Sequence, residues 1–274
     1  MREVCQVLEL SSSAYYAWRS AEPTSRELRD NDLLPLVRAI FWKHRRRYGA
    51  RRIADDLADL GHAVSERKVA ELLKIAGLRA IQPKSHKPRT TDSRHRLGYN
   101  PNLLLDMKPL TAINQLWVGD ITYVPLRRGG FCYAALLMDR FSRFIVSWNL
   151  LDNMSELLVL PVLRGAIAER QPLPDLIHHT DRGGQYASHA YRAMLRRAGM
   201  QQSMSREANV YDNAFMESCY GTIKTELEMV DYESIADARR EFGEYILYYN
   251  LERKHSALGY LTPHHFEASQ RTRK

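Results

Sequence analysis

The chain has 274 residues, of which 45% are hydrophobic and 26% are charged, as in an ordinary globular protein. No apolar run approaches the roughly 20 residues that a membrane-spanning helix needs, and we expect no signal peptide at the N-terminus. The three cysteines are scattered without CxxC spacing, which argues against a disulfide framework or a cysteine zinc site and favours a reducing cytoplasm.

The net charge of +8 comes from the first 100 residues. They hold 20 Lys and Arg against 12 Asp and Glu, a balance of +8, whereas residues 101–274 hold 20 of each. Such asymmetry is typical of a polyanion-binding arm joined to a neutral domain. A basic surface without a partner is the alternative.

Residues 1–80 are predicted to be helical. Two short helices fill residues 1–20, and a helix over 26–43 follows, which Pro35 should kink or break because proline cannot donate the helical hydrogen bond. Two further helices flank Gly61, the second starting after Ser65, a good N-cap, and stopping at Gly77. This pair predicts a helix-turn-helix-like DNA-binding region, although a purely structural hairpin fits the pattern too.

Basic residues cluster at this helix pair and after it. Residues 81–110 are predicted to be a basic linker, since prolines interrupt it and apolar residues are few. We expect phosphate contacts from both regions, made by Arg46, Arg47, Arg51, Arg52, Arg67, Lys68, Lys84, Lys87 and Arg89.

Residues 111–230 change to a mixed strand and helix pattern. Strands are predicted over 116–125, 131–139 and 143–150, then a helix over 155–170 that Pro161 should kink or split. A strand over 173–179, a helix over 188–198 and a short strand near 201–203 follow. Three antiparallel strands and then strand–helix alternation predict an α/β, RNase H-like core with a mixed five-stranded sheet. Residues 231–274 should add a long helix over 234–249 and a basic tail.

Three carboxylates stand out in this region. Asp120 lies within a predicted strand, Asp181 ends another beside Gly183 and Gly184, and Glu217 begins a helical pattern. Converging carboxylates repel each other unless cations neutralise them, and oxygen-only ligands suit Mg²⁺ or Mn²⁺. Two such ions would clamp the attacking and leaving oxygens of a phosphoryl displacement. Three unrelated surface acids are the alternative.

The motifs around these acids resemble those of OrfB-type transposases of bacterial insertion sequences, members of the retroviral-integrase superfamily with a DDE triad. The resemblance covers nearly the whole chain. It rests on Trp117, Asp120-Ile121-Thr122-Tyr123, His179, Asp181-Arg182-Gly183, Gln185-Tyr186, Ser203-Met204-Ser205, Asp212-Asn213-Ala214, Glu217-Ser218, Lys224, Tyr248-Tyr249-Asn250, Arg253, His255, Leu258-Gly259-Tyr260 and Thr262-Pro263.

The resemblance implies a DNA transposase that cleaves the 3′ ends of its element and uses the freed hydroxyl for strand transfer. It implies Asp120, Asp181 and Glu217 as catalytic residues that hold two Mg²⁺ or Mn²⁺ ions. The implied partners are the terminal inverted repeats, target DNA, further copies of the chain and an upstream-frame protein, usually fused to it. We expect action in the bacterial cytoplasm, at the nucleoid, and not at a membrane.

The sequence pattern leaves the roles of some further candidate site residues open. Lys224 lies seven residues after Glu217, on the same side of a helix, and matches a basic residue of the family thought to hold a phosphate; a solvated lysine is the alternative. Arg182 and Arg206 are also expected to contact DNA. His178 should be a buried strand residue, whereas His179 fits a structural or a substrate-facing role equally.

Three other functions remain open at this stage. An RNase H-like nuclease would cleave DNA without joining it, and its products would distinguish it. A regulator of transposition with a spent active site is disfavoured by the intact triad. A retroviral-type integrase is disfavoured by the missing His/Cys zinc module.

Overall fold

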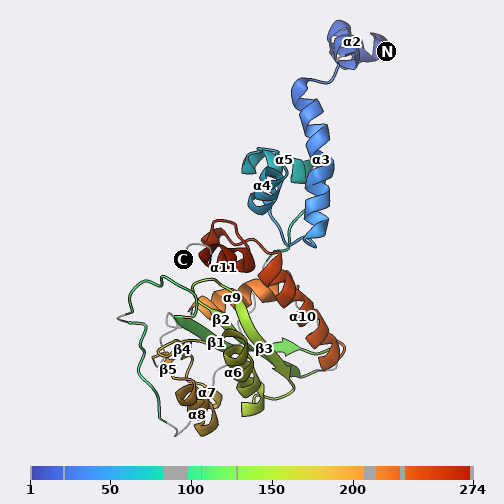
Figure 1. The fold of residues 1–274 in the computed structure, drawn as a ribbon. Coiled ribbons are helices and arrows are strands. Elements are labelled where there is room, and N and C mark those ends of the chain that lie inside the picture. The colour runs from blue at the N-terminus through green and yellow to red at the C-terminus, as the bar shows by residue number, and fades with distance from the viewer. Residues whose placement is uncertain are drawn as a thin grey trace. The chain divides into compact units, whose positions relative to one another are not determined.

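The computed structural model describes residues 2–20, 22–82, 98–105, 107–127, 129–206, 214–228 and 232–271. The predicted DNA contacts Lys84, Lys87 and Arg89 therefore lie outside the described residues. The chain divides into two compact units, residues 1–80 and residues 81–274 (Figure 1). None of the described helices is long and apolar enough to cross a membrane.

The first unit is helical, as its sequence predicts. It contains α1 (Arg2–Val7), α2 (Ser12–Ser20), α3 (Ser25–Lys43), α4 (Ala50–Asp59) and α5 (Glu66–Ile75). The expected break at Pro35 is wrong, because α3 continues through it. Leu33 and Val37 on either side of the proline are buried, and such packing outweighs the loss of one helical hydrogen bond.

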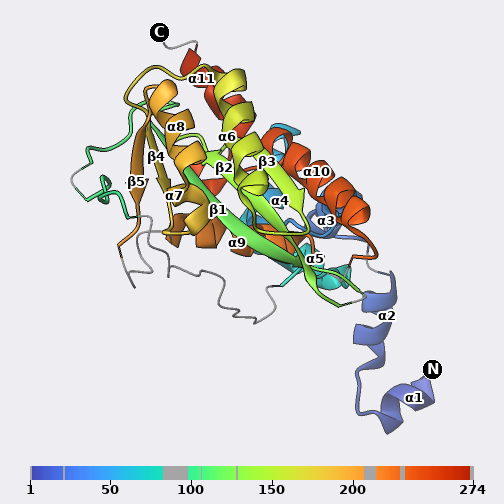
Figure 2. The same ribbon diagram turned by 90° about the horizontal axis from the view of Figure 1, so that it is seen from below.

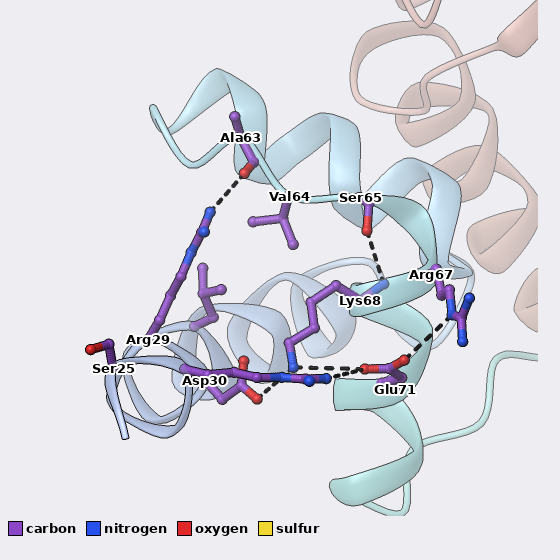
Figure 3. Close-up of a pocket in the computed structure, with 11 residues that line it drawn as sticks. Ser25, Arg29, Asp30, Ala63, Val64, Ser65, Arg67, Lys68 and Glu71 are labelled. Atoms are coloured by element: carbon purple, nitrogen blue, oxygen red, sulfur yellow. Dashed lines mark hydrogen bonds and ion pairs between the residues drawn. The ribbon is translucent and has the colours of Figure 1, made fainter. Parts of the chain in front are cut away.

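Helices α3, α4 and α5 pack on one another, with Ile53, Leu57, Val69 and Leu72 fully buried. The two helices predicted around Gly61 are confirmed, and Ser65 caps α5 by accepting a hydrogen bond from the Lys68 main-chain N–H at 3.3 Å. A cavity of about 670 Å³ opens beside this cap, between α3 and α5 (Figure 3).

The second unit contains a five-stranded sheet. Its strands are β1 (Leu116–Pro125), β2 (Phe131–Asp139), β3 (Ile145–Leu151), β4 (Ile177–Thr180) and β5 (Gln201–Met204), in the order β3-β2-β1-β4-β5. β1, β2 and β3 pair antiparallel, whereas β4 pairs parallel with β1 and β5 parallel with β4. These directions confirm the RNase H-like core.

Two strand starts were predicted too early. β4 begins at Ile177 rather than at 173, because Asp175 has a left-handed backbone (φ 70°) and Leu173 is exposed. β3 begins at Ile145 rather than at 143, because Arg143 is left-handed as well (φ 64°). A left-handed residue interrupts regular strand geometry, so each one here coincides with a boundary that apolar patterning does not reveal.

Helices cover both faces of the sheet (Figure 2). On one face, α6 (Glu156–Arg170), α7 (Gly184–Ala187) and α8 (His189–Arg197) enclose the main core, to which Trp117 and Leu137 contribute from β1 and β2. On the other face lie α9 (Ala214–Glu226) and α10 (Ile235–Leu251), where the Trp148 ring of β3 contacts Phe242 of α10.

Pro161 does not split α6, which runs unbroken from Glu156 to Arg170. The carbonyl of Leu157 is the one that Pro161 cannot bond. The Asn149 side chain of β3 donates to it at 3.3 Å and to the Leu158 carbonyl at 3.2 Å. A partner from the sheet therefore replaces the missing helical hydrogen bond.

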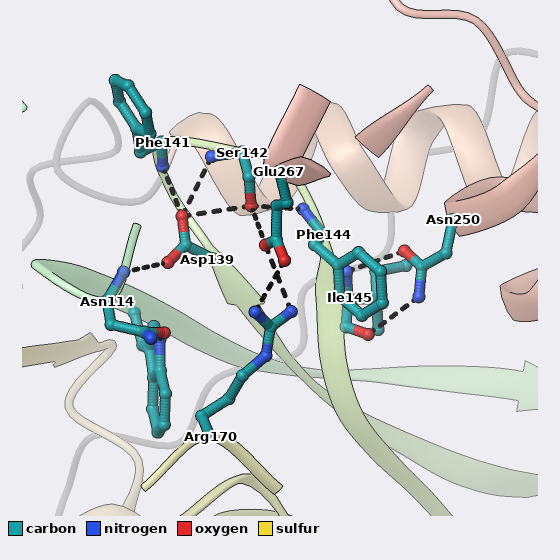
Figure 4. A network of polar contacts seen from close by, with 10 residues as sticks. Asn114, Asp139, Phe141, Ser142, Phe144, Ile145, Arg170, Asn250 and Glu267 are labelled. Carbon is teal, nitrogen blue, oxygen red and sulfur yellow. Dashed lines mark hydrogen bonds and ion pairs between the residues drawn. The ribbon is translucent and has the colours of Figure 1, made fainter. Parts of the chain in front are cut away.

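The C-terminal region holds more structure than the predicted tail. After α10 come the 3₁₀ helix η2 (Ser256–Leu258) and α11 (Pro263–Arg271). Glu267 of α11 accepts two hydrogen bonds from Arg170, at 2.7 and 3.1 Å, and one from the Ser142 hydroxyl at 2.6 Å (Figure 4). Asn250 both accepts from the Ile145 N–H and donates to its carbonyl, each at 2.9 Å. These contacts fasten the C-terminal helices to the sheet.

Residues 98–105, at the end of the predicted linker, lie along the edge strand β5. The Asn100 side chain donates to that of Gln202 at 2.9 Å, and the Leu103 N–H donates to the Ser203 hydroxyl at 2.9 Å. This segment is therefore held by the sheet unit, although the sequence alone offered no pattern for it.

Candidate active site

Asp120 and Asp181 come together through the parallel pairing of β1 and β4. The register matches Trp117 with His178 and Val118 with His179, and continuing it by two residues sets Asp120 beside Asp181. Each carboxylate accepts a main-chain hydrogen bond, Asp120 from the Ile121 N–H at 2.8 Å and Asp181 from the Gly183 N–H at 2.9 Å.

Two buried tyrosines, Tyr186 and Tyr220, lie close enough to both acids for the two carboxylates to affect their pKa. Burial is the first cause that raises the pKa of Tyr186 and that of Tyr220 well above the usual value. Asp120 and Asp181 both contribute to each shift. Both carboxylates therefore act on the same two phenols, one from α7 and one from α9.

Glycines leave room for this approach. A Cβ on Gly183 would lie 3.0 Å from Asp181 Oδ1 and 2.9 Å from Gln185 Oε1. A Cβ on Gly119 would lie 3.0 Å from the His178 ring. Contacts of 3.0 Å are tighter than most real Cβ contacts, so a larger residue at either position would push against His178 or Asp181, whereas the end of the Gln185 side chain could move aside.

Glu217 lies in the first turn of α9, with its side chain exposed. Tyr220 follows three residues later, on a neighbouring position of the helix surface. Its hydroxyl donates to the main-chain carbonyl of Asp120 at 2.6 Å and lies 3.3 Å from that of Ala134. Glu217 is therefore tied to the strand of Asp120 through its own helix.

Asp120, Asp181 and Glu217 do not form a tight cluster of ligand atoms in the structure. Within the described residues, the only set of three or more acidic, His or Cys side chains whose ligand atoms all lie within 4.8 Å is Asp55, Asp56 and Asp59 on α4. Asp56 there already bonds His44 at 3.0 Å. The donors contributed by Asp120, Asp181 and Glu217 are all carboxylate oxygens, which suit Mg²⁺ or Mn²⁺.

The two histidines of β4 are buried. His178 is buried, lies 2.7 Å from the Tyr191 hydroxyl through Nε2, and has its pKa lowered to about 3, chiefly by burial. It therefore stays neutral near pH 7. The His179 ring lies between the hydroxyls of Ser203 (2.8 Å) and Ser205 (3.2 Å). Of the two roles open to His179, structural or substrate-facing, this position between two serines favours the structural one.

Lys224 is half-buried on α9, with Nζ 4.5 Å from the centre of the Tyr123 ring. Burial lowers its pKa, and the negative charge of Asp120 acts in the opposite direction. Its ammonium is thus near the candidate site and is not part of a solvated helix face.

The other predicted DNA contacts occupy two regions. Near the carboxylates, Arg182 donates to the Ser205 carbonyl at 2.8 Å and stacks on the Tyr99 ring, while Arg206 is exposed. In the first unit, Arg46 and Arg47 follow α3, whereas Arg51 and Arg52 lie in the first turn of α4. Arg51 forms an ion pair with Glu66 at 3.0 Å.

Neighbouring residues on α5 differ in exposure (Figure 3). The Arg67 side chain is 92% exposed and pairs loosely with Glu71 at 3.6 Å. The Lys68 side chain is 20% exposed and bonds Asp30 of α3 at 2.5 Å. A phosphate contact by Lys68 would compete with this ion pair, so Arg67 is the more available of the two.

Sequence reasoning missed the residues that hold α9. The sequence pattern gave no functional role to Tyr220 or to the turn residues Arg140 and Arg143. Arg253 was recognised as part of a motif without a function. The spacing of Tyr220, one turn after Glu217, was the one sequence signal that the two residues lie close together on the helix. Its hydrogen-bond partner could not be predicted, because the carbonyl belongs to β1 and is brought near only when the sheet folds.

Comparisons with known proteins agree with this arrangement. Residues 27–86 match an HTH-like domain, and residues 111–210 and 198–263 match integrase core domain models. The chain is 38% identical over 247 residues to the transposase for insertion sequence element IS904 of Lactococcus lactis, covering 89% of this chain and 97% of that one. The chain belongs to the insertion-sequence transposases with an integrase core domain.

Other relatives of this transposase share its full extent. It is 38% identical over 262 residues to the insertion element IS600 uncharacterized 31 kDa protein of Shigella sonnei, covering 95% of this chain and 96% of that one. It is 34% identical over 271 residues to transposase InsF for insertion sequence IS3A of Escherichia coli, covering 97% and 93%. The chain is therefore a DNA transposase, an enzyme of the DDE polynucleotidyl transferase class, which uses divalent metal ions.

Solved structures give weaker matches. The HTLV-2 integrase catalytic core domain in complex with magnesium has a TM-score of 0.47 at 15% identity, covering 57% of this chain and 97% of that one. The catalytic core domain of BIV integrase has a TM-score of 0.45 at 17% identity, covering 58% and 98%.

Proposed function

We propose that this transposase cleaves the 3′ ends of its element and joins them to DNA at a site formed by Asp120, Asp181 and Glu217. The supporting observation is the parallel pairing of β1 with β4, whose register, continued by two residues, sets Asp120 beside Asp181. The hydrogen bond from the Tyr220 hydroxyl to the Asp120 carbonyl supports adding Glu217, because Tyr220 and Glu217 lie on the same helix.

The three carboxylates would hold Mg²⁺ or Mn²⁺, two ions in our proposal. Such ions activate the attacking oxygen and stabilise the charge on the leaving oxygen. The Ile121 and Gly183 N–H groups orient the carboxylates of Asp120 and Asp181. Lys224, half-buried and near Asp120, would hold a phosphate of the reacting strand. In joining, the bond from phosphorus to the target's 3′ oxygen breaks as the bond to the element's 3′ oxygen forms.

We further propose that the helix-turn-helix-like unit binds the terminal inverted repeats while the integrase core binds element ends and target DNA. The proposed contacts are Arg46, Arg47, Arg51, Arg52, Arg67, Lys84, Lys87, Arg89, Arg182 and Arg206, with Lys68 limited by its ion pair. The active species would be a homo-oligomer on DNA in the cytoplasm, at the nucleoid, acting with an upstream-frame protein or as a fusion to it.

The test replaces each carboxylate by its amide. Asp120→Asn, Asp181→Asn and Glu217→Gln should each abolish cleavage and joining of a labelled element end in Mg²⁺, since each removes a metal ligand at nearly constant volume. Duplex binding and the thermal midpoint should remain. The control is Glu169→Gln, an exposed acid on α6, which should join at the wild-type rate. Retained joining by any of the three variants, in Mg²⁺ or Mn²⁺, would refute the assignment.

A further inference from the structure

Arg140 and Arg143 form a pair of cations at the start of α9. They come from the turn between β2 and β3, and both guanidinium groups lie on the ring of Phe215. Their Cζ atoms are 4.1 and 3.9 Å from the ring centre. Phe215 lies in the first turn of α9, the helix that also carries Glu217, so the pair lies against the start of that helix.

Within the part of the chain that the structure describes, no carboxylate offsets the charge of this pair. Both arginines are half-buried. Burial lowers the pKa of Arg140; burial and then the charge of Arg140 lower the pKa of Arg143 to about 10. An aromatic face offsets only part of the cost of desolvating two like charges.

The groups that surround Arg143 do not neutralise it. Tyr249 and Cys219 are its other electrostatic neighbours, and burial is the first cause that raises the pKa of each. Both therefore stay uncharged near pH 7. The backbone of Arg143 is also left-handed, with φ 64°, a conformation that is uncommon for arginine and that tends to persist at functional sites.

We propose that Arg140 and Arg143 form a binding site for a phosphodiester of the DNA at the start of α9. The proposal rests on the proposed function, because it takes DNA as the substrate of the three carboxylates. A guanidinium group matches a phosphate with two parallel N–H donors. The Phe215 ring holds both guanidinium groups at the start of α9, so a bound phosphodiester would be fixed relative to that helix.

The first measurement is the salt dependence of binding to a duplex that carries the element end. Arg140→Gln and Arg143→Gln should each reduce the slope of log K against log[salt] by about 0.9, the value for one lost phosphate contact. The control is Arg164→Gln, an exposed arginine on α6, on the opposite face of the sheet (Figure 2). It should keep the wild-type slope.

The second measurement is thermal stability without DNA. Removing one of two repelling cations should leave the midpoint of Arg140→Gln unchanged or higher, and inorganic phosphate should raise the wild-type midpoint more than the variant's. A lower midpoint with an unchanged salt slope would show that the pair only fastens α9, and the proposal would be wrong. Phosphate stabilisation with an unchanged DNA slope would also overturn it, since the site would then accept only small anions.

The two variants keep the result interpretable. If one of them does not fold, the other removes a charge from the same ring and gives the same comparison. Asp120→Asn, measured in parallel, separates this proposal from the proposed function. Wild-type joining by Asp120→Asn would refute the catalytic assignment, whereas an unchanged slope for Arg140→Gln and Arg143→Gln would refute only the phosphodiester site.

Discussion

Tyr220 links two of the proposed metal ligands through one hydrogen bond. Its hydroxyl donates to the carbonyl of Asp120 at 2.6 Å, and Glu217 precedes it by three residues on the same helix. The distance between Glu217 and Asp120 therefore depends on a buried phenol that has no direct part in the chemistry.

We predict that Tyr220→Phe slows joining by about tenfold and raises the Mg²⁺ concentration needed for half-maximal rate. Loss of the hydroxyl leaves buried carbonyls less well bonded, which costs about 1–3 kcal/mol, and lets α9 shift on β1; small displacements of catalytic groups cost large factors in rate. Mn²⁺ binding without DNA, followed by electron paramagnetic resonance, should weaken in parallel.

Tyr245→Phe is the matched control. Its hydroxyl is also buried and bonds α9, but at the far end, to Glu226 at 3.0 Å. This variant should lose stability and keep the wild-type metal dependence. If the two variants changed metal binding equally, Tyr220 would have only a general role in holding the helix.

Single residues were predictable where their type carries the function. The acids could be recognised from their motifs, and the spacing of Lys224 from Glu217 indicated a position near the site. His179 was ambiguous because its partners, Ser203 and Ser205, come from β5 and from the loop after it. Arg140 and Arg143 resemble ordinary turn arginines in sequence, and only folding brings them onto Phe215.

At the scale of elements, the errors came from partners that local sequence does not contain. Pro161 should interrupt a helix, yet Asn149 from β3 bonds the carbonyls of Leu157 and Leu158. The long strand β1 was predicted with its observed ends because its apolar run ends where its pairing ends. Helix α11 was missed because its link to the sheet, from Glu267 to Arg170, spans 97 residues.

The far end of α9 is held by a buried ion pair. Arg253, just beyond α10, donates to Glu226 through Nη2 at 2.7 Å and through Nε at 2.9 Å. Their side chains are 6% and 8% exposed. This contact gives a structural role to the arginine of the C-terminal motif, since it joins the helix of Glu217 to the last helices of the chain.

We predict that Arg253→Met destabilises the protein by about 3–5 kcal/mol, because it leaves the Glu226 carboxylate buried without its partner. Adding Glu226→Met should recover a large part of that loss, since no unpaired charge then remains. Urea unfolding of the two single variants and the double variant measures the coupling. Additive losses would contradict a direct interaction between these side chains.

At the scale of the whole molecule, sequence separated the two kinds of structure correctly. Helical spacing in residues 1–80 and strand patterns after residue 111 both follow from the burial of apolar side chains, which local sequence records. Strand order also follows from simple rules, since consecutive antiparallel strands lie side by side. The residues of each unit that contact DNA cannot be predicted from that pattern, because they depend on which Lys and Arg side chains stay exposed after folding.

Charge provides a test at this scale. Residues 1–97 hold 20 Lys and Arg against 12 Asp and Glu, a balance of +8, and residues 98–274 hold 20 of each. We predict that the full chain binds non-specific duplex DNA with a steeper salt dependence than residues 98–274, because neutralised phosphates release counterions. A cut before residue 98 keeps the contacts of Asn100 and Leu103 with β5. Equal slopes would show that the basic excess is not the DNA-binding surface.

Two adjacent residues of α5 make the same test within the intact chain. Arg67→Gln should reduce the salt slope by about 0.9, because an arginine that is 92% exposed and pairs only at 3.6 Å with Glu71 can reach a phosphate. Lys68→Gln removes the same charge, but from a side chain bonded to Asp30 at 2.5 Å. It should leave the slope nearly unchanged and lower the thermal midpoint of the helical unit. The reverse pattern would mean that Lys68 leaves Asp30 when DNA binds.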